Sequence, residues 1–306
     1  MNMEISTKIS KLEAFLKKEQ IKYFLDEPVA KHSSFKIGGV AAIAIFPSTT
    51  QQLCAVLCAV RSLEIKLEVI GNASNILFAF EKYNGALIFT TDIIGYRIDG
   101  EKIYAECGAS LVRMANVARG NSLSGLEFAC GIPARIGGAI VMNAGAHGSE
   151  MAKIVEYTDA FDLKNGEHIR IYDNHYGYRR SIYLEDKLLI CLGASMILQN
   201  GNQGEISEKM HQNAEKRKAS QPLSFPSAGS YFKRPEGDFA GRLIEECGLK
   251  GERIGGAEVS SKHAGFIVNV GGASFYDVLA LEEKIKERVM SRFGIELYRE
   301  VRLIED

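Results

Sequence analysis

The chain has 306 residues, a formal net charge of −1 from 37 basic and 38 acidic side chains, and the apolar content of a globular protein. Its length suits two domains with separate cores. The balanced charge excludes a global field that attracts nucleic acid or an anionic membrane. No window approaches the roughly 18 consecutive apolar residues of a membrane span.

The first third of the chain predicts a strand–helix–strand unit. The N-terminus has the spacing of an amphipathic surface helix and not the unbroken apolar segment of a signal peptide. We expect a strand at 40–46, a helix capped by Thr49 or Thr50, and a short buried strand at 67–70. The small polar turn 71–75 (GNASN) follows, where a βαβ-like unit often binds a nucleotide; a purely structural turn is the alternative.

Residues 125–148, GLEFACGIPARIGGAIVMNAGAHG, hold six glycines and almost no charge. Each interior glycine costs a helix or strand roughly 0.5–1 kcal/mol relative to alanine, so regular structure is not expected here. Small residues let a backbone approach a ligand closely, and the N–H groups of such a loop suit phosphate oxygens. The stretch therefore indicates either a phosphate cradle or a tight structural loop.

The middle of the chain predicts antiparallel sheet. A short strand at 102–107 and a short helix at 111–117 come first. Three β-type runs follow the glycine-rich stretch, at 154–163, 168–172 and 188–199. The composition then becomes polar, which places a domain boundary near residue 200, with a helix at 205–219 leading into the second domain.

The last third has a different pattern. Residues 225–235 read as a proline-bounded turn segment and 239–247 as a short helix. A strand is expected at 265–270, then a helix capped by Ser274, then a closing strand at 295–304.

Few residues stand out as candidates for chemistry. Arg179 and Arg180 point to opposite faces if their segment is extended, so one can bind a carboxylate while the other meets solvent. Ser230 follows a glycine in a tight turn and suits a proton donor or an anion ligand. It lacks the elbow of a serine hydrolase. For the two arginines and for Glu300, which alternates with an apolar residue near the C-terminus, a surface position is the alternative.

Metal and disulfide chemistry are not expected. The six histidines have no metal-binding spacing, and the six cysteines are expected to be reduced and mostly buried. No metal is predicted.

Six motifs, in order and spanning about residues 31–304, resemble the UDP-N-acetylenolpyruvoylglucosamine reductase family of flavoproteins. They are FKIGG (35–39), the stretch 125–148, YRRS (178–181), PSAGSYFKRPEGDFAGRLIEECGLKG (226–251), SKHAGFIVN (261–269) and EVR (300–302).

The resemblance implies an α+β fold in two domains. Residues 1–200 would form an FAD-binding domain of the vanillyl-alcohol oxidase (PCMH) type, with lobes of roughly 1–95 and 96–200. Residues 201–306 would form a smaller α+β substrate-binding domain. The short junction after YRRS resembles the shorter type II form of the family.

The resemblance also implies a reaction. NADPH reduces non-covalent FAD, and the hydride then passes to the enolpyruvyl group of UDP-N-acetylglucosamine enolpyruvate, giving UDP-N-acetylmuramate for peptidoglycan synthesis. Arg179 and Glu300 match the residues near the substrate carboxylate, and Ser230 matches the proton donor. The implied setting is the cytoplasm, with small-molecule substrates and neither nucleic acid nor membrane as a partner.

The remaining implied contacts fall into two sets. The substrate set is Lys218, Tyr231, Lys233 and Arg234. The cofactor set is Gly71, Asn72, Ala73, Ser74, Asn75, Gly125, Gly131, Ile132, Gly137, Gly138, Ala139, Asn143, Ala144, Gly145 and Arg302, with the amides of 137–139 and 143–145 expected near the cofactor.

The sequence departs from the family pattern at several positions. Ala73 and Ala134 replace common glycines, Val40 replaces a proline, and Arg234 stands where asparagine is frequent. Two other functions remain open. One is a flavin oxidase of the same fold, with flavin linked covalently through His147 or Cys107. The other is a non-catalytic nucleotide-sugar or flavin-binding module, which has no need of a proton donor.

Overall fold

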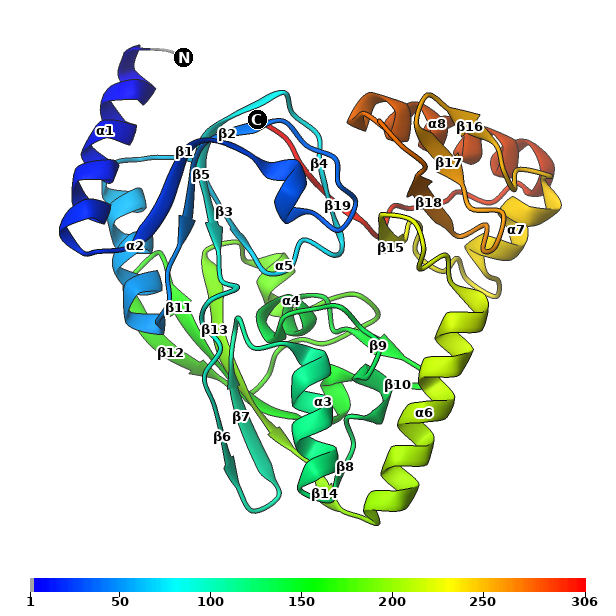
Figure 1. Ribbon diagram of the computed structural model, residues 1–306, viewed down its shortest axis with the longest axis horizontal. Coiled ribbons are helices and arrows are strands. Elements are labelled where there is room, and N and C mark those ends of the chain that lie inside the picture. The colour runs from blue at the N-terminus through cyan, green and yellow to red at the C-terminus, as the bar shows by residue number, and fades with distance from the viewer. Residues whose placement is uncertain (1–2) are drawn as a thin grey trace. The chain divides into compact units, whose positions relative to one another are not determined.

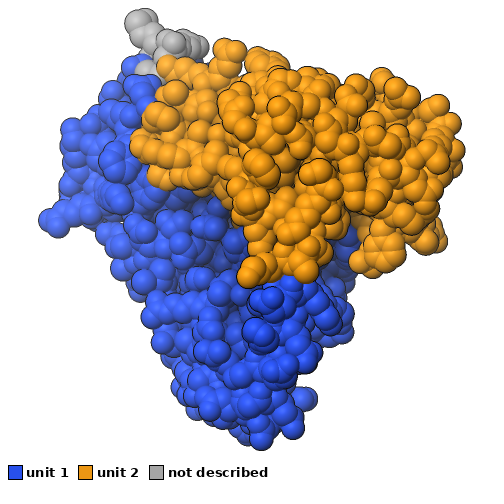
Figure 2. Space-filling view, turned by 45° about the vertical axis from the view of Figure 1, so that its right-hand side comes forward, with its two compact units in different colours: residues 1–26, 42–72, 84–216 blue, residues 27–41, 73–83, 217–306 orange. Residues whose placement is uncertain are grey.

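The computed structural model describes residues 3–306 (Figure 1). The chain forms two compact units, coloured separately in Figure 2. Unit 1 consists of Met1–Asp26, Ala42–Asn72 and Asn84–Lys216, and unit 2 of Glu27–Ala41, Ala73–Tyr83 and Arg217–Asp306.

Two short N-terminal segments therefore belong to the same unit as the C-terminal third of the chain. A division by sequence order alone cannot place them there. The domain limits 1–200 and 201–306 stay a prediction.

Unit 1 contains the antiparallel sheet that the β-type runs predict. Its strand order is β12-β11-β13-β7-β6, and all four neighbouring pairs are antiparallel. The strands are β6 (Tyr96–Asp99), β7 (Lys102–Glu106), β11 (Val155–Asp162), β12 (Glu167–Ile171) and β13 (Leu189–Ile197). Helices α3 (Leu111–Gly120) and α4 (Ile136–Val141) share a hydrophobic core with this sheet.

A four-stranded sheet, in the order β1-β2-β5-β3, contains the predicted strand–helix–strand unit. Thr49 caps helix α2, because its hydroxyl accepts the N–H of Gln52 at 3.1 Å. The apolar face of α2 packs in one core with α1, as the spacing of both helices predicts. The elements are α1 (Met3–Lys18), β1 (Lys22–Pro28), β2 (Val40–Phe46), α2 (Thr50–Ser62), β3 (Leu67–Ile70) and β5 (Lys82–Phe89).

The glycine-rich stretch is not a plain loop, and here the prediction was wrong. It contains the six-residue helix α4, with glycine at positions 137 and 138. A Cβ built on Gly137 would lie 3.0 Å from Cys107 Cβ, so glycine lets this helix pack closely against the end of β7. Tertiary packing thus outweighs the low helix propensity of the glycines.

Smaller elements complete unit 1. The two-residue strands pair as β8 with β14 and β9 with β10. Helix α6 begins at Gln203, near the predicted residue 205. It contains a boundary between the units, because Lys216 belongs to unit 1 and Arg217 to unit 2. The elements are β8 (Leu123–Ser124), η2 (Glu127–Ala129), β9 (Gly145–Ala146), β10 (Ser149–Glu150), η3 (Met151–Lys153), α5 (Ile182–Glu185), β14 (Gln199–Asn200) and α6 (Gln203–Ser220).

Unit 2 has its own core and a four-stranded sheet in the order β15-β18-β17-β16. Ser274 caps α8 as predicted, in a capping box in which Asp277 accepts the Ser274 N–H at 2.9 Å. A second, parallel pair joins β4 to β19. The elements are η1 (Val29–His32), β4 (Ile76–Phe78), β15 (Ser227–Ser230), α7 (Ala240–Glu246), β16 (Arg253–Ile254), β17 (Ala257–Val259), β18 (Phe266–Asn269), α8 (Phe275–Phe293) and β19 (Arg302–Ile304).

Two expectations for the last third need correction. The segment 225–235, predicted as a turn, contains strand β15. The closing strand covers only Arg302–Ile304 of the expected 295–304, because the residues before it make isolated contacts with 231–233 instead of a continuous ladder.

All six cysteines carry free thiols. Within the described part of the chain, the helices are too short or too polar to cross a membrane.

Candidate functional site

The structure brings together two of the segments predicted to bind a cofactor in unit 1. The side-chain amide of Asn72 donates to the carbonyl of Pro133 at 2.9 Å. A Cβ built on Gly71 would lie 3.2 Å from Arg135 Cβ, so the turn after β3 fits closely against the glycine-rich stretch. Arg135 in turn donates to the carbonyl of Gly108 at 3.1 Å. The sequence analysis did not predict this bracing role of Arg135.

The backbone amides around α4 are not equally available to a ligand. The N–H of Gly137 donates to the Cys107 carbonyl at 2.8 Å, and that of Ala139 donates to the Arg135 carbonyl at 2.9 Å. Gly138 is exposed, and a Cβ built on it would meet no atom within 4 Å. Of the three residues 137–139 predicted to face the cofactor, two have their amides bonded within the protein. Gly138 is the one of the three that stays open to a ligand.

The second group of expected amides is also engaged internally. The N–H groups of Asn143 and Ala144 donate to the carbonyls of Ile140 and Ala139. Asn143 has φ 42°, and its buried side chain donates to the Gly177 carbonyl at 3.0 Å and accepts from the Ala152 amide at 2.9 Å. This asparagine fastens the glycine-rich stretch to the turn that carries Arg179.

Arg179 and Arg180 have different surroundings, as predicted, but not because the segment is extended. Gly177 and Arg180 exchange backbone hydrogen bonds of 3.2 and 3.1 Å in a tight turn, with Arg179 in the left-handed region at φ 52°. The Arg179 guanidinium lies 3.4 Å from the carbonyl oxygens of Asn143 and Gly145. Arg180 pairs with Glu185 at 2.5 Å. Only Arg179 is thus held beside the glycine-rich stretch.

Glu127 holds the start of the same stretch. Its carboxylate accepts from the Ser124 hydroxyl at 2.7 Å and from the Gly125 amide at 2.8 Å. Burial alone would raise the pKa of Glu127, but these hydrogen bonds outweigh it, so the pKa lies below its ordinary value. The side-chain amide of Asn213, on α6, donates to the Glu127 carbonyl at 3.1 Å. The Gly125 backbone that donates to this carboxylate has φ 131°, a conformation that glycine adopts readily.

In unit 2, Ser230 ends strand β15 and is exposed. It pairs with Phe266 in a register that is irregular between Ser227 and Ser230, where Gly229 has φ 84°. The Ser34 hydroxyl donates to the Ser227 carbonyl at 2.8 Å and lies 3.2 Å from that of Ala73. Ser34, which the sequence did not single out, thus joins the small polar turn to β15.

Glu300 is fixed through its backbone on both sides. Its N–H donates to the Tyr231 carbonyl at 2.9 Å, and its own carbonyl accepts the Asn75 side-chain amide at 3.2 Å. The N–H of Arg302 donates to the Asn75 carbonyl at 2.9 Å. The structure therefore brings Ser230, Glu300, Arg302 and Asn75 together, although they are up to 227 positions apart (302 − 75).

Tyr231 does not have the place expected of a substrate ligand. Its side chain is 1% exposed, and its hydroxyl donates to Glu282 at 2.8 Å. Tyr231 lies just after the end of β15, where its N–H donates to the Gly265 carbonyl at 2.8 Å and its ring packs in the core of unit 2. Burial raises the pKa of the Tyr231 phenol. The sequence missed Glu282, whose signal is a carboxylate among the apolar positions Val278, Leu281 and Ile285 of one helix face.

The other expected substrate residues lie on the surface of unit 2 or at the end of α6. Lys218 is exposed, and its carbonyl accepts the Lys262 ammonium at 2.6 Å. The backbone of Lys233 donates to the Tyr298 carbonyl at 2.8 Å. The Arg234 guanidinium lies 4.6 Å from the centre of the Phe239 ring.

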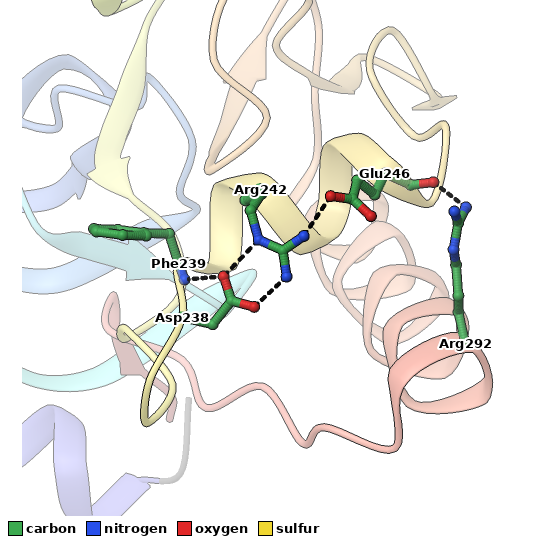
Figure 3. A network of polar contacts seen from close by, with 5 residues as sticks. All are labelled: Asp238, Phe239, Arg242, Glu246 and Arg292. Atoms are coloured by element: carbon green, nitrogen blue, oxygen red, sulfur yellow. Dashed lines mark hydrogen bonds and ion pairs between the residues drawn. The ribbon is translucent and has the colours of Figure 1, made fainter.

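A polar network fixes α7, which follows this segment (Figure 3). The carboxylate of Asp238 accepts the Phe239 amide and Arg242 Nε, both at 2.7 Å. Arg242 also pairs with Glu246, whose carbonyl accepts from Arg292 on α8. Phe239 therefore has a fixed backbone, although the residue is 58% exposed, and its ring lies next to Arg234.

The covalent-flavin alternative loses one of its two candidates. Cys107 is buried at the end of β7, and burial raises the pKa of its thiol, so it is a poor nucleophile. His147 is exposed in a turn with φ 52°. Among residues 3–306, no three His, Cys, Asp or Glu side chains gather into a group that could hold a metal.

Comparisons with known proteins cover both units. The family model described as UDP-N-acetylenolpyruvoylglucosamine reductase, C-terminal domain, matches residues 221–304, and the one described as FAD binding domain matches 41–172. The UDP-N-acetylenolpyruvoylglucosamine reductase of Caldanaerobacter subterraneus subsp. tengcongensis is 45% identical, with 97% of each chain covered. That of Clostridium botulinum strain Hall is 41% identical over 92% of each chain.

A solved structure of the same family is also similar to this chain. The UDP-N-acetylenolpyruvylglucosamine reductase (MurB) of Thermus caldophilus superposes with a TM-score of 0.78 at 31% identity, covering 93% of this chain and 99% of that one. The chain belongs to the UDP-N-acetylenolpyruvoylglucosamine reductase family, with an FAD-binding domain followed by the C-terminal domain of that family.

Proposed function

We propose that this chain reduces UDP-N-acetylglucosamine enolpyruvate to UDP-N-acetylmuramate, with NADPH as the reductant and FAD as the bound cofactor, in peptidoglycan precursor synthesis. Family membership across 97% of the chain carries the proposal. The cytoplasm is the proposed compartment, and the two small molecules are the proposed partners. The shorter type II form is also part of the proposal.

The residues present fit FAD. Gly71 and Asn72 lie against Pro133 and Arg135, and Gly138 leaves open space where any other residue would project a side chain. Together they give a close approach of small residues with few competing side chains, which suits a diphosphate and a flat ring. When bound, FAD supplies the hydride that reduces the enolpyruvyl double bond. We assign its contacts to these residues. The rest of the predicted cofactor set stays part of the proposal, without the amides of 137, 139, 143 and 144, which bond within the protein.

Side chains of the protein stabilise the developing negative charge and supply the proton. As hydride reaches the terminal carbon of the enolpyruvyl group, negative charge develops on the adjacent carbon and its carboxylate. We assign Arg179 to that carboxylate, because a guanidinium offers two parallel donors. Ser230 gives its hydroxyl proton to the charged carbon, and Glu300 lies near the same carboxylate. A serine hydroxyl has a high pKa, so it donates only to a strongly basic centre such as this one.

Anaerobic NADPH oxidation by the purified holoprotein tests the function directly. We expect one turnover of flavin reduction without the nucleotide sugar and continuous oxidation of NADPH when UDP-N-acetylglucosamine enolpyruvate is added. Flavin that NADPH bleaches but this substrate never reoxidises would contradict the reductase assignment. Acid precipitation should release all the yellow colour; colour retained on the pellet would point to the covalent oxidase.

The variant Gly138→Ala tests the cofactor assignment without disturbing the fold. The added methyl meets no protein atom within 4 Å, so the free energy of unfolding of the apoprotein should not fall. Against a bound ligand, the same methyl should cost about 1–3 kcal/mol, as overpacking does in cores. That is about a five- to 150-fold rise in the dissociation constant for FAD, measured by flavin fluorescence titration of the apoprotein.

Gly120→Ala is the matched control. Gly120 is also exposed on a helix of unit 1, and a Cβ there also meets nothing within 4 Å. Equal FAD affinities for the two variants and the wild type would remove Gly138 from the cofactor set.

A further inference from the structure

A single buried carboxylate on α8 connects the two segments of unit 2 that carry Ser230 and Glu300. The Glu282 side chain is 0% exposed. One of its oxygens accepts both the Tyr231 hydroxyl at 2.8 Å and Arg299 Nε at 2.7 Å. Its other oxygen pairs with Lys286 at 2.6 Å. All four side chains belong to the same unit.

The two residues bound to the same oxygen are the immediate neighbours of proposed catalytic residues. Tyr231 follows Ser230, and Arg299 precedes Glu300. The backbones of the two segments are also joined, by the Glu300 N–H to the Tyr231 carbonyl and by a bridge between Phe232 and Arg299. The carboxylate therefore ties together, from the interior, the two backbone segments that carry Ser230 and Glu300.

Stability alone does not account for this arrangement. Removing a carboxylate from water is costly, and well-packed apolar side chains of similar volume usually stabilise a core at least as well as a buried ion pair does. Burial raises the pKa of Glu282, but hydrogen bonds from Arg299, Lys286 and Tyr231 outweigh this and hold the pKa below its ordinary value. The group is thus charged at neutral pH, and its directional bonds specify a geometry that apolar packing would not.

We propose that Glu282 is a positioning residue for the reductase reaction: through Tyr231 and Arg299 it sets the placement of Ser230 relative to Glu300. The proposal rests on the proposed function. It assigns no contact with substrate to Glu282 or Tyr231. Catalytic groups need placement to within about 0.5 Å. Removing one of the hydrogen bonds to Glu282 should therefore slow proton delivery more than it weakens substrate binding.

Tyr231→Phe is the primary test, because it removes one hydroxyl and keeps the buried ring. We expect reoxidation of the reduced holoenzyme by saturating UDP-N-acetylglucosamine enolpyruvate, followed anaerobically by stopped flow, to slow about tenfold, which is about 1.4 kcal/mol. Reduction by NADPH and FAD content should stay within about twofold of the wild type, and the KM for the enolpyruvyl substrate should change less than kcat.

Tyr298→Phe is the matched control. It makes the same chemical change two residues before Glu300, at an exposed phenol that contacts Glu296 instead of Glu282. It should reoxidise at the wild-type rate. A Tyr231→Phe enzyme that also reoxidises at the wild-type rate, with only its melting temperature lowered, would overturn the positioning role and leave the reductase function standing.

Glu282→Gln adds a second, independent measurement. If the tyrosine acts through this carboxylate, the double variant Glu282→Gln/Tyr231→Phe should reoxidise no more slowly than Glu282→Gln alone. Independent, multiplying losses would overturn the proposal. If Glu282→Gln does not fold, the Tyr231→Phe result decides alone. A wild-type enzyme that the enolpyruvyl substrate never reoxidises would overturn the function and the positioning role together.

Discussion

Replacing Ser230 by alanine should leave reduction of the flavin by NADPH intact and slow its reoxidation by UDP-N-acetylglucosamine enolpyruvate by about 10²-fold or more. The physical reason is that the substrate carbon becomes strongly basic only as hydride arrives, and the alanine side chain has no proton to give. Ser230 is exposed at the end of β15, so the fold of unit 2 should tolerate the change. Stopped-flow absorbance of the flavin in the two half-reactions measures the effect.

Ser224→Ala provides the comparison. Ser224 is an exposed serine in the loop that leads into β15, outside the proposed set. Its variant should match the wild type in both half-reactions. Normal turnover of Ser230→Ala would show that the proton comes from elsewhere.

Arg179→Lys should lower kcat/KM for the enolpyruvyl substrate by about 10²-fold, comparable to the loss of one donor to a developing oxyanion. A lysine keeps the charge but offers a point charge where a guanidinium offers two parallel donors. The Arg179 guanidinium is directed by carbonyl oxygens of Asn143 and Gly145 at 3.4 Å, which are long for hydrogen bonds. These contacts hold the guanidinium beside the glycine-rich stretch, and we assign it there to the substrate carboxylate.

The adjacent residue is an internal control for this prediction. Arg180→Lys makes the same change one position along, where the guanidinium pairs with Glu185 on the surface. We expect its steady-state kinetics to stay within about twofold of the wild type, since exposed ion pairs contribute little. Near-normal kinetics for Arg179→Lys would exclude the carboxylate-binding role, and equal losses for both variants would indicate damage to the turn.

Much of the secondary structure follows from the sequence, because it depends on local patterns. The apolar run of β2 and the threonine cap of α2 are both predicted from the sequence, and the structure contains both. The same holds for the serine cap of α8. These features depend on alternation, helical spacing and the hydrogen bond of one side chain to a nearby amide.

The failures have a common cause in contacts between distant residues. The helix inside the glycine-rich stretch forms because Gly137 packs against Cys107, thirty positions earlier in the chain. The short closing strand and the membership of 27–41 and 73–83 in unit 2 also depend on partners far along the chain. No local pattern encodes such pairings.

Six motifs in order are enough to predict the family from the letters of the chain, together with the residue types available for the chemistry. How those residues are held depends on the folded arrangement. It turned Tyr231 inward to Glu282, placed Asn75 on the Glu300 carbonyl, and left Gly138 as the open position of its loop. The physical reason is that motifs record which side chains are present, whereas burial and hydrogen-bond partners are set by segments that meet only when the chain has folded.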